Sequence, residues 1–261
     1  MNLAQQYFED TSMKTALIEL MWIANKAILE VYHSDNVDVD LKSDASPVTQ
    51  ADLAAHEVLL AGLQRLTPDI PVVSEEDPES HELGLQGKPF WLIDPLDGTK
   101  EFISRNGEFT CNLALIEQGR STLGLVSVPI DELIYIGGNG LGASKIYRNQ
   151  EPTAIRCMRQ PGVTRVVASK SHLNEATESF INSIETEVEL IQVGSSLKLL
   201  RIAEAMADIY PRLAPTCEWD IAAGHAVLEG AGGRVLDLNK EPLRYGKVSK
   251  LNPYFIASNE G

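Results

Sequence analysis

The strongest chemical signal in the sequence is residues 91–99, Trp-Leu-Ile-Asp-Pro-Leu-Asp-Gly-Thr. An apolar, strand-like run delivers the carboxylate of Asp94 at its end, Pro95 stiffens the turn, and Asp97 follows three residues later. Both carboxylates can reach one point, and Gly98 leaves room there for a ligand such as phosphate. Taken alone, the segment is equally consistent with a polar turn whose aspartates cap a helix.

Two other acidic positions add to this signal. Glu75-Glu76-Asp77 follows a short apolar run, and Asp220 opens a predicted helix. Carboxylates gathered at one place repel one another unless a cation neutralises them, and oxygen ligands without clustered His or Cys favour Mg²⁺, Mn²⁺ or Ca²⁺. We therefore expect a divalent-metal site. A solvated charge run at residues 75–77 and a helix-terminal charge at Asp220 are the alternatives.

The order and spacing of these motifs resemble a known family. Glu75-Glu76, the segment 94–99, and Trp219-Asp220 followed by Gly232-Gly233 look like the signature of the inositol monophosphatase superfamily, which consists of Mg²⁺-dependent, lithium-inhibited phosphomonoesterases. Residues 74–78, 100–103, 106–110 and 194–198 are similar to its bacterial 3'(2'),5'-bisphosphate nucleotidases. The resemblance implies a layered αβαβα sandwich, α+β in the N-terminal half and α/β in the C-terminal half, with the metals between the halves.

The resemblance also implies a set of metal ligands. Glu75, Asp94 and the carbonyl oxygen of Leu96 would hold one Mg²⁺, while Asp94, Asp97 and Asp220 would hold a second. Mn²⁺ is an expected substitute. Two cations close together can bind phosphate oxygens, lower the pKa of a water and stabilise the departing alkoxide.

Three further residues carry catalytic roles by the same resemblance. Thr99 and Asp52 would orient the attacking water, and Glu76 would lie close by and help to hold a third, weakly bound metal. The spacing of Thr49 and Asp52 also matches a capping box, which would explain Asp52 without any contact to Thr99.

Substrate selection is expected in the second half. Ser195 and Ser196 lie where a helix begins, and Lys198 lies in its first turn, where a cation is unfavourable unless it meets an anion. A helix cap with an exposed lysine is the alternative. The resemblance adds further residues that would border the substrate: Glu75, Leu96, Asp97, Gly98, Thr99, Ser169, Ser171, His172 and Asp220.

The expected reaction is hydrolysis of the 3'-phosphate of adenosine 3',5'-bisphosphate to AMP and phosphate. Removal of this by-product of sulfate activation would link the enzyme to sulfate assimilation, and 3'-phosphoadenylyl sulfate is an expected further substrate. Hydrolysis of inositol monophosphate or fructose 1,6-bisphosphate is the alternative within the superfamily. A non-catalytic divalent-ion or nucleotide sensor and an acidic interaction scaffold are alternatives of other classes.

The hydrophobic pattern predicts the elements that must position these residues. Helical spacing of apolar residues predicts one long helix over residues 3–31 and a second that begins after Thr49 and ends before Pro68. Short apolar runs then predict mostly antiparallel strands at residues 71–73, 90–93, 111–116, 122–128 and 133–136. The glycines at residues 137–142 are interpreted as a hairpin turn.

The second half alternates strands and helices. Strands are predicted at residues 165–168, 188–193 and 208–213, and helices at 175–184, 196–206 and 219–229. This alternation indicates a parallel or mixed sheet with crossover helices. We expect an α+β subdomain over residues 1–153 that carries most metal ligands and an α/β subdomain over 154–261 that carries Asp220 and the substrate-selecting residues.

Composition limits the partners and the compartment. With 37 acidic and 22 basic residues, the formal charge of −15 would repel nucleic acid. The three cysteines are widely spaced and suggest neither a disulfide framework nor a zinc site, which favours a reducing cytoplasm. Charged residues interrupt the first thirty positions, so no membrane span is expected; peripheral contact with the inner membrane is left open. The protein is expected to act as a monomer or homodimer on a small nucleotide bisphosphate.

Overall fold

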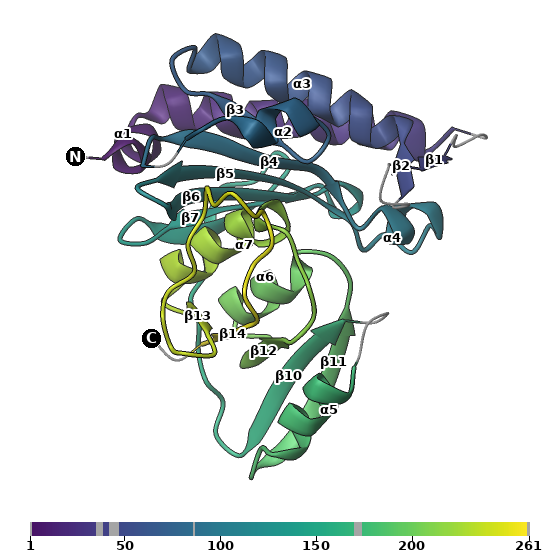
Figure 1. Ribbon diagram of the computed structural model, residues 1–261, viewed down its shortest axis with the longest axis vertical. Helices are drawn as coiled ribbons and strands as arrows, with labels where there is room; N and C mark the ends of the chain where they lie inside the picture. The colour runs from purple at the N-terminus through teal and green to yellow at the C-terminus, as the bar shows by residue number, and fades with distance from the viewer. Residues whose placement is uncertain (1, 35–38, 42–46, 86, 170–173, 260–261) are drawn as a thin grey trace.

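Helices and sheets alternate in five layers. The computed structural model describes residues 2–34, 39–41, 47–85, 87–169 and 174–259. Figure 1 shows two long helices above a large sheet, two helices beneath that sheet, a second sheet, and a last helix beside it. This is the layered αβαβα sandwich predicted from the sequence.

The first layer consists of α1 (Leu3–Glu9), α2 (Thr11–Tyr32) and α3 (Gln50–Leu66). The prediction of a single helix over residues 3–31 was wrong, because the chain is extended at Asp10. The Asp10 carboxylate accepts hydrogen bonds from the amides of Ser12 and Met13 at 2.8 and 3.2 Å and thereby caps α2. Helix α3 begins directly after Thr49, as predicted.

The second layer is a seven-stranded sheet. Its strands lie in sequence order: β3 (Val72–Ser74), β4 (Phe90–Asp97), β5 (Thr110–Glu117), β6 (Arg120–Val128), β7 (Leu133–Gly138), β8 (Gly142–Tyr147) and β9 (Thr153–Ala154). Only β3 and β4 pair in parallel, so the predicted antiparallel character is confirmed. The predicted glycine-rich turn joins β7 to β8. Strands β8 and β9 were not predicted, nor was the small antiparallel pair of β1 (Val39–Leu41) and β2 (Pro47–Thr49).

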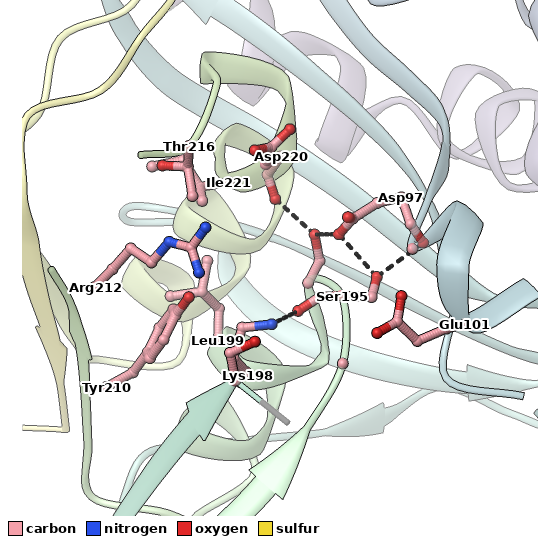
Figure 2. Close-up of a pocket in the computed structure, with 14 residues that line it drawn as sticks. Asp97, Glu101, Ser195, Lys198, Leu199, Tyr210, Arg212, Thr216, Asp220 and Ile221 are labelled. Carbon is pink, nitrogen blue, oxygen red and sulfur yellow. Dashed lines mark hydrogen bonds between the residues drawn. The ribbon is translucent and has the colours of Figure 1, made fainter. Parts of the chain in front are cut away.

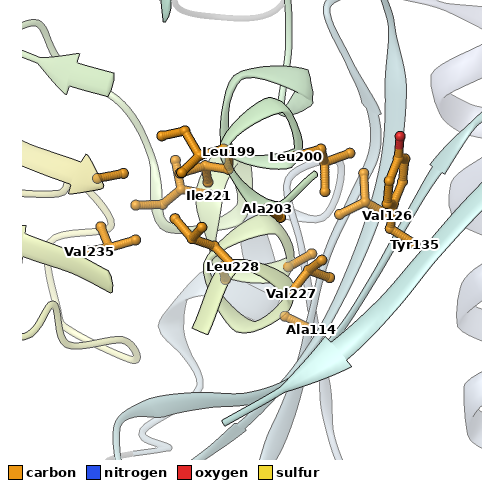
Figure 3. Close-up of a cluster of buried hydrophobic side chains, with 14 of the residues drawn as sticks. Ala114, Val126, Tyr135, Leu199, Leu200, Ala203, Ile221, Val227, Leu228 and Val235 are labelled. Carbon is orange, nitrogen blue, oxygen red and sulfur yellow. The ribbon is translucent and has the colours of Figure 1, made fainter. Parts of the chain in front are cut away.

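Both faces of the large sheet are buried, which explains its nearly continuous apolar strands. Along β5, Leu113 and Leu115 pack against the first helical layer, whereas Ala114 and Ile116 pack against the middle one. This alternation is the period of two that a strand imposes. Figure 3 shows the core between the large sheet and the middle helical layer. In this core, Val126 and Tyr135 from the sheet belong to one cluster with Leu200 and Val227 from the helices beneath.

The middle layer consists of α6 (Leu197–Ala203) and α7 (Glu218–Gly230). Helix α7 lies directly on β6: a Cβ atom added at Gly124 would come within 2.1 Å of the Ala223 carbonyl oxygen. Only glycine permits this approach. The chain's second half therefore packs tightly on the sheet that its first half builds.

The lower sheet contains five strands in the order β11-β10-β12-β14-β13. Their bounds are β10 (Val163–Ser169), β11 (Glu187–Val193), β12 (Ile209–Arg212), β13 (Arg234–Asp237) and β14 (Phe255–Ser258), with α5 (Glu175–Asn182) outside. Because β14 runs antiparallel to both of its neighbours, the predicted mixed sheet is confirmed. Strands β13 and β14, of four residues each, were not predicted. The division of the chain after residue 153 stays a prediction.

Three short helices lie outside these layers: the 3-10 helices η1 (Pro78–Glu82) and η2 (Pro129–Asp131), and α4 (Thr99–Ile103). Within the described ranges, no helix combines the length and apolarity needed to cross a bilayer.

A buried ion pair ties together the lower sheet. The Asp208 carboxylate accepts hydrogen bonds from the Arg165 guanidinium at 2.8 and 3.0 Å and from the Asn259 amide group at 2.7 Å. Although burial raises the pKa of Asp208, these bonds lower it below its ordinary value overall. Asp208 thus connects β10, the start of β12 and the chain after β14.

Replacing Asp208 by Asn should destabilise the fold by about 3 kcal/mol, because the Arg165 cation would lose its buried counter-charge. Urea unfolding at neutral pH measures the difference. The exposed pair of Lys26 and Glu30, 3.7 Å apart, offers a control in which E30Q should change stability by less than about 0.5 kcal/mol. Equal stabilities of D208N and E30Q would contradict this account.

Candidate active site and metal centre

Three carboxylates meet at the edge of the large sheet. Glu75 follows β3, Asp94 lies in β4, and Asp220 lies in the first turn of α7. The parallel pairing of β3 with β4 brings the first two together, and the Glu75 amide donates to the Ile93 carbonyl at 3.2 Å. One oxygen from each of the three carboxylates lies within 4.8 Å of the others. The convergence expected from the sequence is therefore present for these three residues.

The sequence predicted that β4 ends at Asp94, and this was wrong. The strand continues to Asp97 with a register shift between the two aspartates. The proline between them lacks an N–H group and cannot donate to the ladder, which accounts for an irregularity at this point. The shift lets a single strand present both carboxylates near the site.

The local electrostatics favour a cation. Burial raises the pKa of Asp94 well above its ordinary value, and the nearby charges of Glu75, Asp97, Asp220 and Glu76 raise it further. Asp94 is 1% exposed, and its Oδ1 has no hydrogen-bond partner among the described residues. A buried carboxylate oxygen without a donor, surrounded by like charges, is suited to a hard divalent ion.

Asp97 lies beside this triplet and connects the two halves of the chain. Its Oδ2 accepts hydrogen bonds from the hydroxyls of Ser195 at 2.8 Å and Ser196 at 2.9 Å (Figure 2). Ser195 has a φ of 54°, an uncommon conformation for a residue with a side chain. Both serines were predicted to contact substrate; in the structure their hydroxyls contact Asp97. The expected role of the Leu96 carbonyl stays a prediction.

Asp52 and Thr99 do meet. The Thr49 amide donates to Asp52 Oδ2 at 2.8 Å as part of the capping box of α3, and the Thr49 hydroxyl donates to the same oxygen at 2.6 Å. The Thr99 hydroxyl donates to the other oxygen, Oδ1, at 3.3 Å. Asp52 thus caps α3 and also contacts Thr99, while its role in orienting water stays a prediction. Gly98, just before, has a φ of 93°, and a Cβ atom there would lie 3.2 Å from the Glu108 carbonyl oxygen.

Asp220 also has two roles, since its Oδ2 accepts a hydrogen bond from the Cys217 amide at 2.8 Å while the side chain belongs to the carboxylate triplet. Partial burial and the charges of Asp97 and Glu75 raise the pKa of Asp220. Glu76 is half-buried, and its amide donates to the Ser74 hydroxyl at 3.2 Å.

A pocket opens next to the carboxylates. It is bordered by Asp97 and Asp220 on one side and by two cations, Lys198 and Arg212, on the other (Figure 2). Lys198 is only 7% exposed, so the alternative of an exposed lysine was wrong. Burial lowers the pKa of Lys198 to about 8. Its ammonium donates to the Ser195 carbonyl and lies 5.7 Å from the centre of the Tyr210 ring.

The alternative of a helix cap was also wrong. Ser196 lies at the N-cap position of α6, but its side chain makes no capping bond there. Its hydroxyl instead accepts from the Asn112 side chain at 2.8 Å. Ser169 lines the pocket as predicted, whereas Ser171 and His172 lie outside the described residues.

Sequence reasoning missed Arg212. It lies at the end of β12, and its Nε–H has no hydrogen-bond partner within the part of the chain that the structure describes. A single arginine in an otherwise apolar strand, eight residues before Asp220, was the available signal. Tyr210, Glu101 and Thr216 also line the pocket and were missed.

Comparisons with known proteins find relatives over most of the chain. A sequence model of the inositol monophosphatase family matches residues 9–260. The 3'(2'),5'-bisphosphate nucleotidase CysQ of Escherichia coli K12 is 44% identical over 237 residues, which are 90% of this chain and 95% of that protein. The CysQ of Haemophilus influenzae is 33% identical over 232 residues, covering 87% of this chain and 86% of that protein.

A solved structure of a relative has the same fold. The crystal structure of CysQ from Bacteroides thetaiotaomicron, described as a bacterial member of the inositol monophosphatase family, matches with a TM-score of 0.85 and 38% identity over 96% of this chain and 98% of that one. The match of the family model and the identity to these relatives show that the chain belongs to the inositol monophosphatase family.

Proposed function

We propose that the protein is a Mg²⁺-dependent 3'(2'),5'-bisphosphate nucleotidase that hydrolyses the 3'-phosphate of adenosine 3',5'-bisphosphate to AMP and phosphate. The sulfated analogue, 3'-phosphoadenylyl sulfate, is a second substrate of the same kind. The observation that carries the proposal is one pocket lined by carboxylates and by two cations. The names of the CysQ relatives support the same substrate class.

The proposed donor set would hold two magnesium ions. Glu75, Asp94 and the Leu96 carbonyl would hold one, and Asp94, Asp97 and Asp220 would hold the other, with Asp94 shared. Glu76 is a candidate for a weaker third position, and Mn²⁺ is an expected substitute. When bound, Mg²⁺ lowers the pKa of water and neutralises the charge that builds up on a phosphate ester during hydrolysis.

Thr99 and Asp52 would orient the attacking water. Because the Thr99 hydroxyl donates its hydrogen to Asp52, the lone pairs of its oxygen are available to accept a hydrogen bond from water. Asp52 is itself fixed by two hydrogen bonds from Thr49. The pair would therefore aim a water at the phosphorus atom, and the chain needs no nucleophile of its own.

Lys198 and Arg212 would bind the second phosphate of the substrate. Burial and the charge of Arg212 lower the pKa of Lys198, while the carboxylates that line the same pocket raise it. A bisphosphate supplies an anion for the two cations at one end while the other end reaches the carboxylates. A sugar monophosphate has no second phosphate to place there.

The purified protein should release phosphate from adenosine 3',5'-bisphosphate in MgCl₂ and release none in EDTA. Inositol 1-phosphate and fructose 1,6-bisphosphate, assayed at the same concentration, should react more slowly. A preference for either sugar phosphate would overturn the nucleotide assignment and leave a phosphatase. Stabilisation by Mg²⁺ without phosphate release from any substrate would instead indicate a sensor.

Replacing Asp94 by Asn should lower kcat by a factor of about 10³ or more, since the shared metal ligand loses its charge. Thermal unfolding in EDTA should show that the variant is at least as stable as the wild type, because Asp94 is repelled by its neighbours. The exposed Asp131 offers the matched control D131N, which should retain activity and stability. Full turnover in D94N would contradict the assigned metal site.

Replacing Arg212 by Met should lower kcat/KM for adenosine 3',5'-bisphosphate by about 10- to 100-fold, the effect of losing charge-assisted hydrogen bonds. Turnover of 3'-AMP, which lacks the second phosphate, should change by less than about threefold. R65M, at an exposed arginine on α3, is the control. An equal loss on both substrates would argue against a second-phosphate site.

A further inference from the structure

His81 touches the residues that precede two of the metal ligands. Its Nε2 lies 2.7 Å from the carbonyl oxygen of Ser74, the residue before Glu75. Its ring stacks on that of Trp219, the residue before Asp220, with centroids 4.8 Å apart and planes inclined by 26°. Since a carbonyl can only accept, Nε2 carries the hydrogen in this contact.

The contact with Ser74 acts on a rigid peptide unit. The Ser74 carbonyl and the Glu75 amide belong to one planar group. His81 holds its oxygen end, and the Ile93 carbonyl in β4 accepts from its N–H end at 3.2 Å. The backbone from which the Glu75 side chain projects is therefore fixed on both sides.

The rest of the loop strengthens this arrangement. Ser74 is 1% exposed; its hydroxyl lies 2.8 Å from Nδ1 of His56 and accepts from the Glu76 amide at 3.2 Å. The Ser80 hydroxyl in turn accepts from the Ser74 amide at 3.1 Å. His81 is thus attached to a loop with little freedom to move independently of it.

The contact with Trp219 acts on the other half of the chain. Trp219 is 8% exposed and lies in the first turn of α7, where the Asp220 carboxylate is held by the Cys217 amide. Because the Trp219 ring is buried, its position is connected to that of the N-terminal end of α7. Through one imidazole, the loop that bears Glu75 rests against the helix that bears Asp220.

We propose that His81 is a positioning residue that sets the separation of Glu75 and Asp220 and thereby the affinity for Mg²⁺. The inference rests on the proposed metal-dependent function. It goes beyond it by assigning a role to a residue that binds neither metal nor substrate. A residue that served only the stability of the loop would affect unfolding but not the concentration of Mg²⁺ needed to fill the site.

The test is a titration of thermal stability with MgCl₂ at constant ionic strength, started from EDTA-treated protein. A ligand that binds only the folded state raises the Tm with a midpoint set by its affinity. H81A, which loses both contacts, should need about three- to tenfold more Mg²⁺ than the wild type. H81F, which keeps an aromatic ring, should lie between them, with kcat at saturating Mg²⁺ changed less than twofold.

H33A, at an exposed histidine at the end of α2, should match the wild type. If both His81 variants unfold at a lower temperature but keep the wild-type Mg²⁺ midpoint, the inference is wrong and the role is structural. This result is independent of substrate identity. Absence of nucleotide hydrolysis by the wild type would count against the proposed function alone, whereas absence of any Mg²⁺ response in the wild type would overturn the positioning role too.

Discussion

Repulsion among carboxylates is the constraint on which the rest of this structure depends. Glu75, Asp94 and Asp220 come within 4.8 Å of one another, and Asp97 adds its charge from beside them. Ionised carboxylates at such distances repel one another. They are held together by apolar packing elsewhere, above all by α7 lying against β6 at Gly124. Packing of the core offsets this repulsion, which a bound cation would relieve.

Asp97 makes polar contacts between the two halves of the chain. Ser195 and Ser196 come from the second half, yet both hydroxyls lie within hydrogen-bond distance of this carboxylate from the first. Ser195 adopts a left-handed backbone conformation to do so. Strain of this kind is found where the surrounding structure overrides local preference, typically at functional sites. The site is complete only when both halves are in place.

The sequence was sufficient to predict the site residues that belong to motifs with a recognisable order and spacing along the chain. The convergence of the carboxylate triplet was expected from such motifs, whereas the contact of Asp52 with Thr99 was suggested by the family resemblance, with a capping box as the alternative. The break at Asp10 was missed because the apolar stripe continues across it, and a side-chain cap overrode the periodicity. Arg212 was missed, since its importance depends on a pocket built from segments that lie far apart in the sequence. Short strands such as β13 carry too few residues to establish a period.

The burial of both faces of the large sheet has a consequence for biosynthesis. All seven strands have been made by residue 154, but the helices that cover the lower face, α6 and α7, end only at residue 230. While the ribosome adds the intervening stretch, on the order of ten seconds, apolar side chains such as Ile116 and Val126 have nothing to pack on. The nascent chain thus exposes apolar surface in this interval. Such surface favours aggregation and is what chaperones bind.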